Sequence, residues 1–169
     1  MAEPSRLSEI QLPWEKSIIY FVTMCAKDHH KVLANSRVFE ATKSAIQELR
    51  RWQVLAAVMM PDHAHFIVAP AEDRELSVGD FANGFKRLLR KSLTNQRWEW
   101  QRGCFDRLLR SDENLESKWI YVQDNPVRAG LVRVGADWPY YLDFINEGGK
   151  LTASPTEAGP IPSEGIGVI

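Results

Sequence analysis

The feature that most constrains the fold of this 169-residue chain is a pair of apolar runs separated by one short break. Residues 53–60 (QVLAAVMM) form a continuous apolar run of strand length. Pro61-Asp62 interrupts it, and residues 63–69 (HAHFIVA) resume it. Apolar runs of this length, bounded by a turn signal, are typical of buried strands. The pair therefore predicts a β-hairpin at the middle of a sheet.

Periodic segments flank this hairpin on both sides. Strand-type and helix-type patterns predict strands at 17–25 and 104–109 and helices over 36–51, 76–93 and 114–124. The last helix is expected to end before Asn125-Pro126, because a residue before proline avoids the α region. This order of elements predicts an α+β, ferredoxin-like split βαβ sandwich, with an antiparallel sheet of about four or five strands and helices on one face. Residues 131–132 and 138–144 are expected to cover its C-terminal part.

Length and composition indicate one domain, over residues 1–146, followed by a tail. Residues 147–169 are rich in Gly, Pro, Ser and Thr and are expected to be disordered. No apolar run approaches the roughly 20 residues that span a bilayer, so a cytoplasmic protein without membrane contact is expected. Cys25 and Cys104 lack the spacing of metal ligands and are expected to be small buried thiols.

The first chemical signal is His63-Ala64-His65 within the second run. Side chains two residues apart in a strand point to the same face, so both imidazoles are expected to lie together. Their neighbours are strongly apolar, and buried polar groups need partners. Hydrogen bonds to backbone or carboxylate groups are one explanation of the pair, and a shared metal ion is the other.

The second signal is Tyr121 with Asn125 on the last predicted helix. Residues four apart lie on one helix face, although Pro126 is expected to make this alignment imperfect. A tyrosine acts as a covalent nucleophile when its proton is removed or a metal polarises its target. The alternative is an amphipathic packing residue, which is the usual role of tyrosine on a helix.

Positive charge gathers in the middle of the chain, although the net charge is only −1. Lys86, Arg87, Arg90 and Lys91 recur on one predicted helix face, and with other arginines that follow they form a candidate phosphate-binding surface: Arg97, Arg102 and Arg110. Trp98 and Trp100 are candidates for base stacking, although a place in the core is favoured for both. A solvated helix face is the alternative explanation of the charges.

Taken together, these motifs resemble a known family. MPDHAHFIV (60–68) resembles the HUH segment of the single-tyrosine transposases, and IYVQDNPVRAGLV (120–132) resembles their tyrosine-bearing helix and the signature after it. The block from Trp100 to Val132 is most similar to the REP-associated branch. The resemblance covers about residues 14–145.

The resemblance implies a site and a reaction. His63 and His65 match the metal-ligand histidines, Tyr121 matches the nucleophile, and Asn125 matches a residue that completes the metal site; Glu116 and Gln123 are alternatives for this third ligand. The implied cofactor is Mg²⁺ or Mn²⁺, and the implied helix is mobile. The implied substrate is single-stranded DNA with hairpin or palindromic REP elements, cleaved by a monomer or homodimer through a 5′-phosphotyrosine with release of a 3′-hydroxyl. Phosphates are expected to contact five residues: Lys86, Arg87, Arg90, Lys91 and Arg110.

Two other functions remain open at this point. The same fold could bind nucleic-acid hairpins without catalysis, although the intact histidines and tyrosine disfavour this. A metal-dependent hydrolase could use water on the histidine-bound ion, but it would need further carboxylate ligands, and only Asp62 is adjacent.

Overall fold

The computed structural model describes residues 18–72, 75–109 and 112–145. Its centre is an antiparallel sheet with strand order β4-β1-β3-β2-β5. The five strands are β1 (Ile19–Cys25), β2 (Trp52–Met59), β3 (His63–Pro70), β4 (Phe105–Leu109) and β5 (Tyr141–Asp143). The predicted hairpin is confirmed as β2 and β3. The short β5 falls in the segment that was predicted only as a cover.

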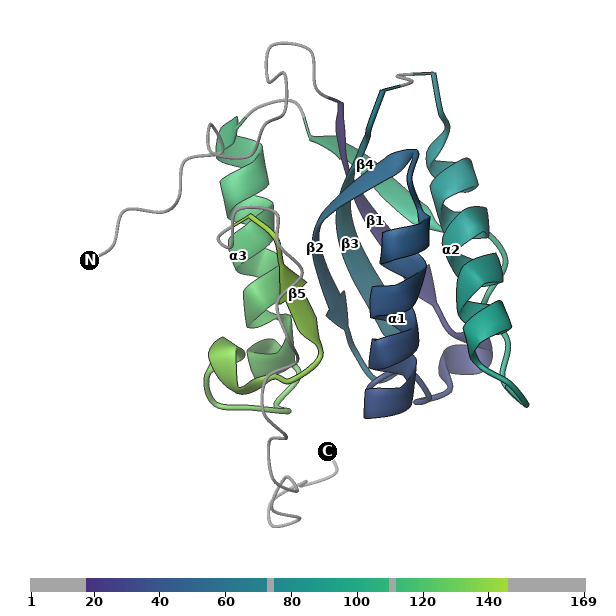
Figure 1. Ribbon diagram of the computed structural model, residues 1–169. Helices are drawn as coiled ribbons and strands as arrows, with labels where there is room; N and C mark the ends of the chain where they lie inside the picture. The colour runs from purple at the N-terminus through teal and green to yellow at the C-terminus, as the bar shows by residue number, and fades with distance from the viewer. Residues whose placement is uncertain (1–17, 73–74, 110–111, 146–169) are drawn as a thin grey trace.

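Three helices pack on the sheet, in two layers (Figure 1). The elements are α1 (Ser36–Glu48), α2 (Val78–Ser92) and α3 (Asp112–Arg128). As predicted, α1 and α2 share one face, whereas α3 covers the opposite face (Figure 1). The predicted α+β fold is therefore confirmed, but its third helix lies on the other side of the sheet.

The position of α3 follows from a sheet that is apolar on both faces. One face packs Phe66 against Phe81 and Phe85 of α2. The other face buries a second set of apolar side chains from sheet and helix: Leu55, Val58, Ile67, Leu115, Trp119 and Val122. Leaving this second set in water would cost about 25 cal/mol per Å² of apolar surface, so a helix must cover it.

The helix ends follow local chemistry. The first helix has Asn35 as its N-cap, whose side-chain oxygen accepts a hydrogen bond from the Val38 N–H at 3.0 Å. The second begins with a capping box, in which Ser77 and Asp80 each accept from the other's backbone N–H. The inward-facing apolar residues of α2 are all buried: Val78, Phe81, Phe85, Leu88 and Leu89.

The prediction that the last helix ends before Pro126 is wrong, because α3 continues to Arg128 and Pro126 lies inside it. The proline removes only one helical donor, and its side chain is buried. The carbonyl of Asn125 accepts from the Ala129 N–H at 3.0 Å, so Asn125 is itself helical. Tyr121 and Asn125 therefore share one helix face.

The remaining predictions concern the C-terminal tail, Arg110, the two cysteines and contact with a membrane. Residues 147–169 and Arg110 lie outside the described residues. Cys25 and Cys104 are both free thiols and only partly buried, and burial raises the pKa of each. Among the described residues, no helix is both long enough and apolar enough to cross a membrane.

The 3-10 turn Gly135–Asp137 packs closely against α3. A Cβ added at Gly135 would lie 2.5 Å from the backbone oxygen of Gln123, so helix and turn would have to separate. We expect Gly135→Ala to lower the free energy of unfolding by about 1–3 kcal/mol in urea denaturation. Gly79→Ala is the control, because its nearest new contact is an ordinary 3.5 Å. Equal effects of the two substitutions would contradict this account.

Candidate active site

The two predicted histidines lie on the sheet face that α3 covers. His63 and His65 are separated by one residue of β3, and their ring centroids are 4.7 Å apart. Ala64, between them, points into the core on the α1 and α2 side. Strand alternation therefore brings the imidazoles together, as the sequence predicts.

Asp62 orients the first histidine. Its carboxylate lies 2.7 Å from Nδ1 of His63 and 3.3 Å from Nδ1 of His29. Burial alone would raise the pKa of the Asp62 carboxyl, but the hydrogen bond and charge of His63, a backbone hydrogen bond and the charge of His29 together lower it. An ionised carboxylate only accepts, so Nδ1 of His63 donates, and the lone pair of a neutral ring is left on Nε2.

Thr23 orients the second histidine. Its Oγ1 lies 2.8 Å from Nδ1 of His65, and the two residues face each other in the register of β1 and β3. Burial lowers the pKa of His65 to about 3, with further contributions from the charges of His63 and Lys118. The ring is therefore neutral at physiological pH, and in the tautomer that donates from Nδ1 to Thr23 it has a free lone pair on Nε2.

This donor set fits a divalent ion. Metal-binding histidines use one ring nitrogen for the ion while the other makes a hydrogen bond, and Nδ1 of each imidazole has such a partner. No three His, Cys, Asp or Glu side chains are grouped for a metal within the part of the chain that the structure describes. Such a pair leaves positions open for a third ligand and for substrate oxygens.

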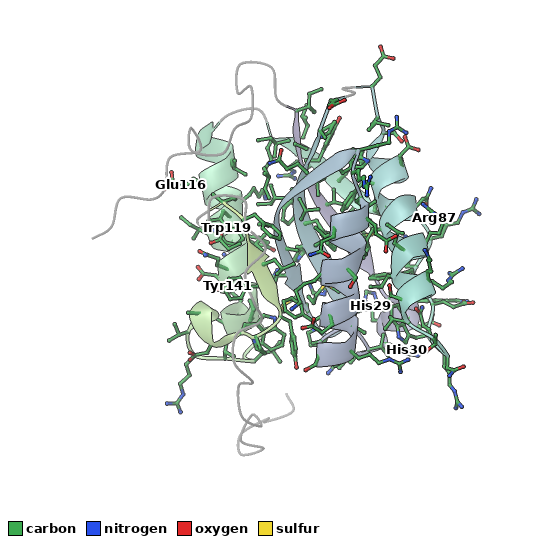
Figure 2. All side chains as sticks on the ribbon, in the orientation of Figure 1. His29, His30, Arg87, Glu116, Trp119 and Tyr141 are labelled. Atoms are coloured by element: carbon green, nitrogen blue, oxygen red, sulfur yellow. The ribbon has the colours of Figure 1, made fainter. Side chains whose placement is uncertain are left out.

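The candidates for the third ligand lie on different sides of α3. Asn125 is half-buried and shares the helix face of Tyr121. Glu116 is exposed and points away from the sheet (Figure 2). Gln123 lines a separate cavity of about 210 Å³ between α3 and the side chains of Trp138 and Tyr141. The geometry favours Asn125 among the three, and its role stays a prediction.

Tyr121 faces the histidines from α3. Its ring centroid is 6.3 Å from that of His65 and 6.3 Å from that of Phe21, which itself stacks on His65 at 5.1 Å. The Tyr121 side of the helix remains open, since the residue is 36% exposed. The nucleophile candidate and the imidazole pair therefore share one accessible surface.

Two cations lie against the Tyr121 ring. Nζ of Lys118 is 5.2 Å from its centroid, and Cζ of Arg128 is 4.3 Å away. Lys118 is also 5.2 Å from the ring centroid of Phe21. These contacts orient the phenol ring and bring two positive charges beside it.

The sequence prediction did not single out several of these residues, although simple signals point to them. Lys118 and Arg128 lie three residues before and seven after Tyr121, which is spacing for one helix face. Phe21 and Thr23 are two residues apart on β1 and so point to one face, but only the strand register identifies them as neighbours of His65. His29, given no role from the sequence, contacts Asp62 from a loop that local spacing does not position.

The four predicted phosphate contacts within α2 belong to the opposite layer. Arg87, Arg90 and Lys91 are exposed on α2, and Arg87 points outward on the far side of the sheet from α3 (Figure 2). Lys86 donates instead to the backbone carbonyls of Gln101 and Gly103, at 2.9 and 2.6 Å. One basic helix thus combines a solvent-facing group of cations with a lysine that fixes the loop before β4.

The neighbouring tryptophans belong to the core, as favoured from the sequence. Trp100 is buried, and Trp98 packs against the same cluster with its ring centroid 5.2 Å from that of Trp100. Trp100 therefore offers no free ring face for base stacking, whereas Trp98 is half-buried.

Comparisons with known proteins find relatives that carry the name of the family that the motifs resemble. The chain is 26% identical over 148 residues to a Haemophilus influenzae protein named as a REP-associated tyrosine transposase, covering 79% of this chain and 84% of the relative. It is 23% identical over 140 residues to the Escherichia coli REP-associated tyrosine transposase, covering 79% and 81%. No family model matches the chain.

A solved structure has the same fold. It is a REP-associated tyrosine transposase bound to a REP hairpin, with a TM-score of 0.62 and 22% sequence identity, over 73% of this chain and 74% of the other. The resemblance predicted from the motifs is therefore confirmed by both sequence and fold comparison.

Burial of His65 makes the stability of the metal-free protein depend on pH. Its pKa is about 3 when folded and about 6.5 when exposed. Between these values the unfolded chain binds a proton that the folded protein does not, so stability falls as pH falls from about 6.5 towards 3. We expect His65→Gln to flatten this slope in urea titrations at several pH values. The exposed His30→Gln should leave it unchanged, and equal slopes in all three proteins would refute the assignment.

Proposed function

Because this chain is a relative of the REP-associated tyrosine transposases, we propose that it is an enzyme that cuts and rejoins single-stranded DNA near hairpins through Tyr121. The observation that carries the proposal is the 6.3 Å between the ring centroids of Tyr121 and His65 on one open surface. A nucleophile and a metal-ligand pair from distant parts of the chain meet there.

Each residue has a task in the proposed reaction. His63 and His65, with Asn125 as third ligand, would hold Mg²⁺ or Mn²⁺. The bound cation would neutralise and orient the scissile phosphate. Lys118 and Arg128 lie close enough to the Tyr121 ring to bind the same phosphate.

The covalent step exchanges the phosphodiester bond to the 3′ oxygen for a bond to the Tyr121 phenol. The Tyr121 oxygen attacks phosphorus as its proton leaves, and a new P–O bond forms to the phenol. The P–O bond to the 3′ oxygen breaks, and that oxygen takes up a proton as the free 3′-hydroxyl. The resulting 5′-phosphotyrosine keeps the energy of the phosphodiester, so attack by a 3′-hydroxyl reverses the step and joins strands without ATP.

Specific features disfavour the two alternatives. A hairpin-binding module without catalysis would not require Asp62 and Thr23 to orient the two imidazoles, or two cations to lie against an exposed tyrosine. A zinc-type hydrolase would need a third strong ligand, and the described residues contain no group of three His, Cys, Asp or Glu side chains for it.

Trapping the covalent intermediate tests the proposal. Labelled single-stranded hairpins taken from the flanks of the gene are incubated with protein and Mg²⁺, and the products are separated under denaturing conditions. The wild type should form a DNA–protein adduct, and Tyr121→Phe should reduce it to background, at least 10³-fold, because the attacking oxygen is lost. Chelation of Mg²⁺ should also abolish the adduct.

Tyr20→Phe is the matched control, because Tyr20 packs on the opposite face of the sheet. It should retain the wild-type yield of adduct. An adduct that persists in Tyr121→Phe, or product strands that form without any adduct under all conditions, would overturn the proposed chemistry. The second result would point to hydrolysis by water.

A further inference from the structure

The edge strand β4 carries two side chains on the same face as the candidate active site. In the sheet register, Phe105 lies opposite Thr23 and Arg107 lies opposite Phe21. Directly paired residues of antiparallel strands turn their side chains to one face. Thr23 contacts His65 and Phe21 stacks on it, so Phe105 and Arg107, called the edge patch below, belong to the active face.

The edge patch is open to solvent. Phe105 is 63% exposed, which is unusual for a phenylalanine in a strand, and Arg107 is exposed beside it. An exposed aromatic ring beside an arginine is the combination that binds unpaired nucleotides, because the ring stacks on a base and the cation binds a phosphate. None of the residues that β1 and β4 turn to this face is acidic: Ile19, Phe21, Thr23, Cys25, Phe105, Arg107 and Leu109.

The edge patch lies on the path of a DNA strand that contacts both helix layers of the molecule. Helix α2 packs on the other face of the sheet, with Arg87 and Arg90 turned to solvent, whereas Tyr121 lies on the face of α3. The strand order ends at β4 beyond β1. A strand of DNA that runs from α2 to Tyr121 past this end of the sheet must cross β4.

Resting on the function proposed above, we propose that unpaired nucleotides next to the hairpin cross the β4 edge, with a base stacked on Phe105 and a backbone phosphate bound by Arg107. Neighbouring strands are about 4.8 Å apart, so Phe105 lies about two strand spacings from His65. The nucleotides that reach Phe105 are therefore those close to the scissile phosphate. The edge patch selects substrates that have a single-stranded tail.

Paired binding measurements test the role of Phe105. Fluorescence anisotropy compares a hairpin carrying a single-stranded tail with the same hairpin lacking the tail. Phe105→Ala should weaken binding of the tailed hairpin about tenfold and leave the tailless one within twofold. Phe105→Tyr should restore tail binding, because it keeps a ring for stacking.

Leu108→Ala is the matched control, since Leu108 lies on the same strand, is 43% exposed and faces the other side of the sheet. It should change neither affinity. Equal losses for tailed and tailless hairpins, or no loss for either, would overturn the proposal. So would a change from dimer to monomer on Phe105→Ala in sedimentation, because the ring would then serve a second copy of the chain at this edge.

The salt dependence of binding tests Arg107 separately. Arg107→Gln should reduce the slope of log affinity against log salt concentration by about one for the tailed hairpin only. Arg87→Gln on α2 should act on tailed and tailless hairpins alike. An unchanged slope for Arg107→Gln would remove the phosphate contact from the proposal.

These outcomes are independent of the proposed chemistry. If Tyr121 forms its adduct while Phe105→Ala leaves tail binding unchanged, the edge patch is refuted and strand transfer stands. If Phe105→Ala weakens tail binding while no adduct forms, the edge patch stands and strand transfer is refuted.

Discussion

The candidate site depends on the register of one central strand. β3 is paired on both sides, and its alternation turns Ala64 and Phe66 to one core and His63 and His65 to the other face. A shift of register by one residue would reverse every side chain of the strand and bury both imidazoles under α1 and α2. The same register aligns Thr23 with His65. Strand pairing thus decides both the location of the histidines and the hydrogen bond that orients one of them.

The second requirement is the rotational setting of α3. Leu115, Trp119 and Val122 anchor this helix on the apolar face of the sheet, and successive helical residues are about 100° apart. This anchoring leaves Tyr121 at the flank of the helix, where its ring meets Phe21 and His65. Tyr121 stays accessible on the open flank because the buried flank holds the helix on the sheet.

Much of this arrangement was predictable from local patterns. The central hairpin, the shared face of His63 and His65, and the inward side of α2 all follow from side-chain periodicity. The continuous apolar runs also indicated strands that are buried on both faces of the sheet, although the predicted fold placed helices on one face only. Pro126 misled the prediction of the last helix, because a preference against the α conformation is small beside the packing of a whole helix.

Other features depend on contacts between distant segments, and local patterns do not contain them. The neutral state of His65 arises from burial beneath α3 and from the charges of His63 and Lys118. Lys86 contacts the carbonyls of Gln101 and Gly103, which lie in the loop between its helix and β4. The nearness of Phe105 to the site depends on the pairing of β4 with β1. Charge periodicity identified α2 as basic, but only the layer order reveals that its cations and Tyr121 lie on opposite sides of the sheet.

The central claim is that His63 and His65 hold a divalent ion in front of Tyr121. Crystals grown with Mn²⁺ and a single-stranded hairpin test it most directly, because anomalous scattering locates the ion without reference to activity. The account predicts one anomalous peak within about 2.3 Å of a nitrogen of each imidazole, with the Tyr121 oxygen directed at a phosphate bound to the same ion. Manganese elsewhere, or imidazoles occupied only by protein hydrogen bonds at saturating Mn²⁺, would contradict it.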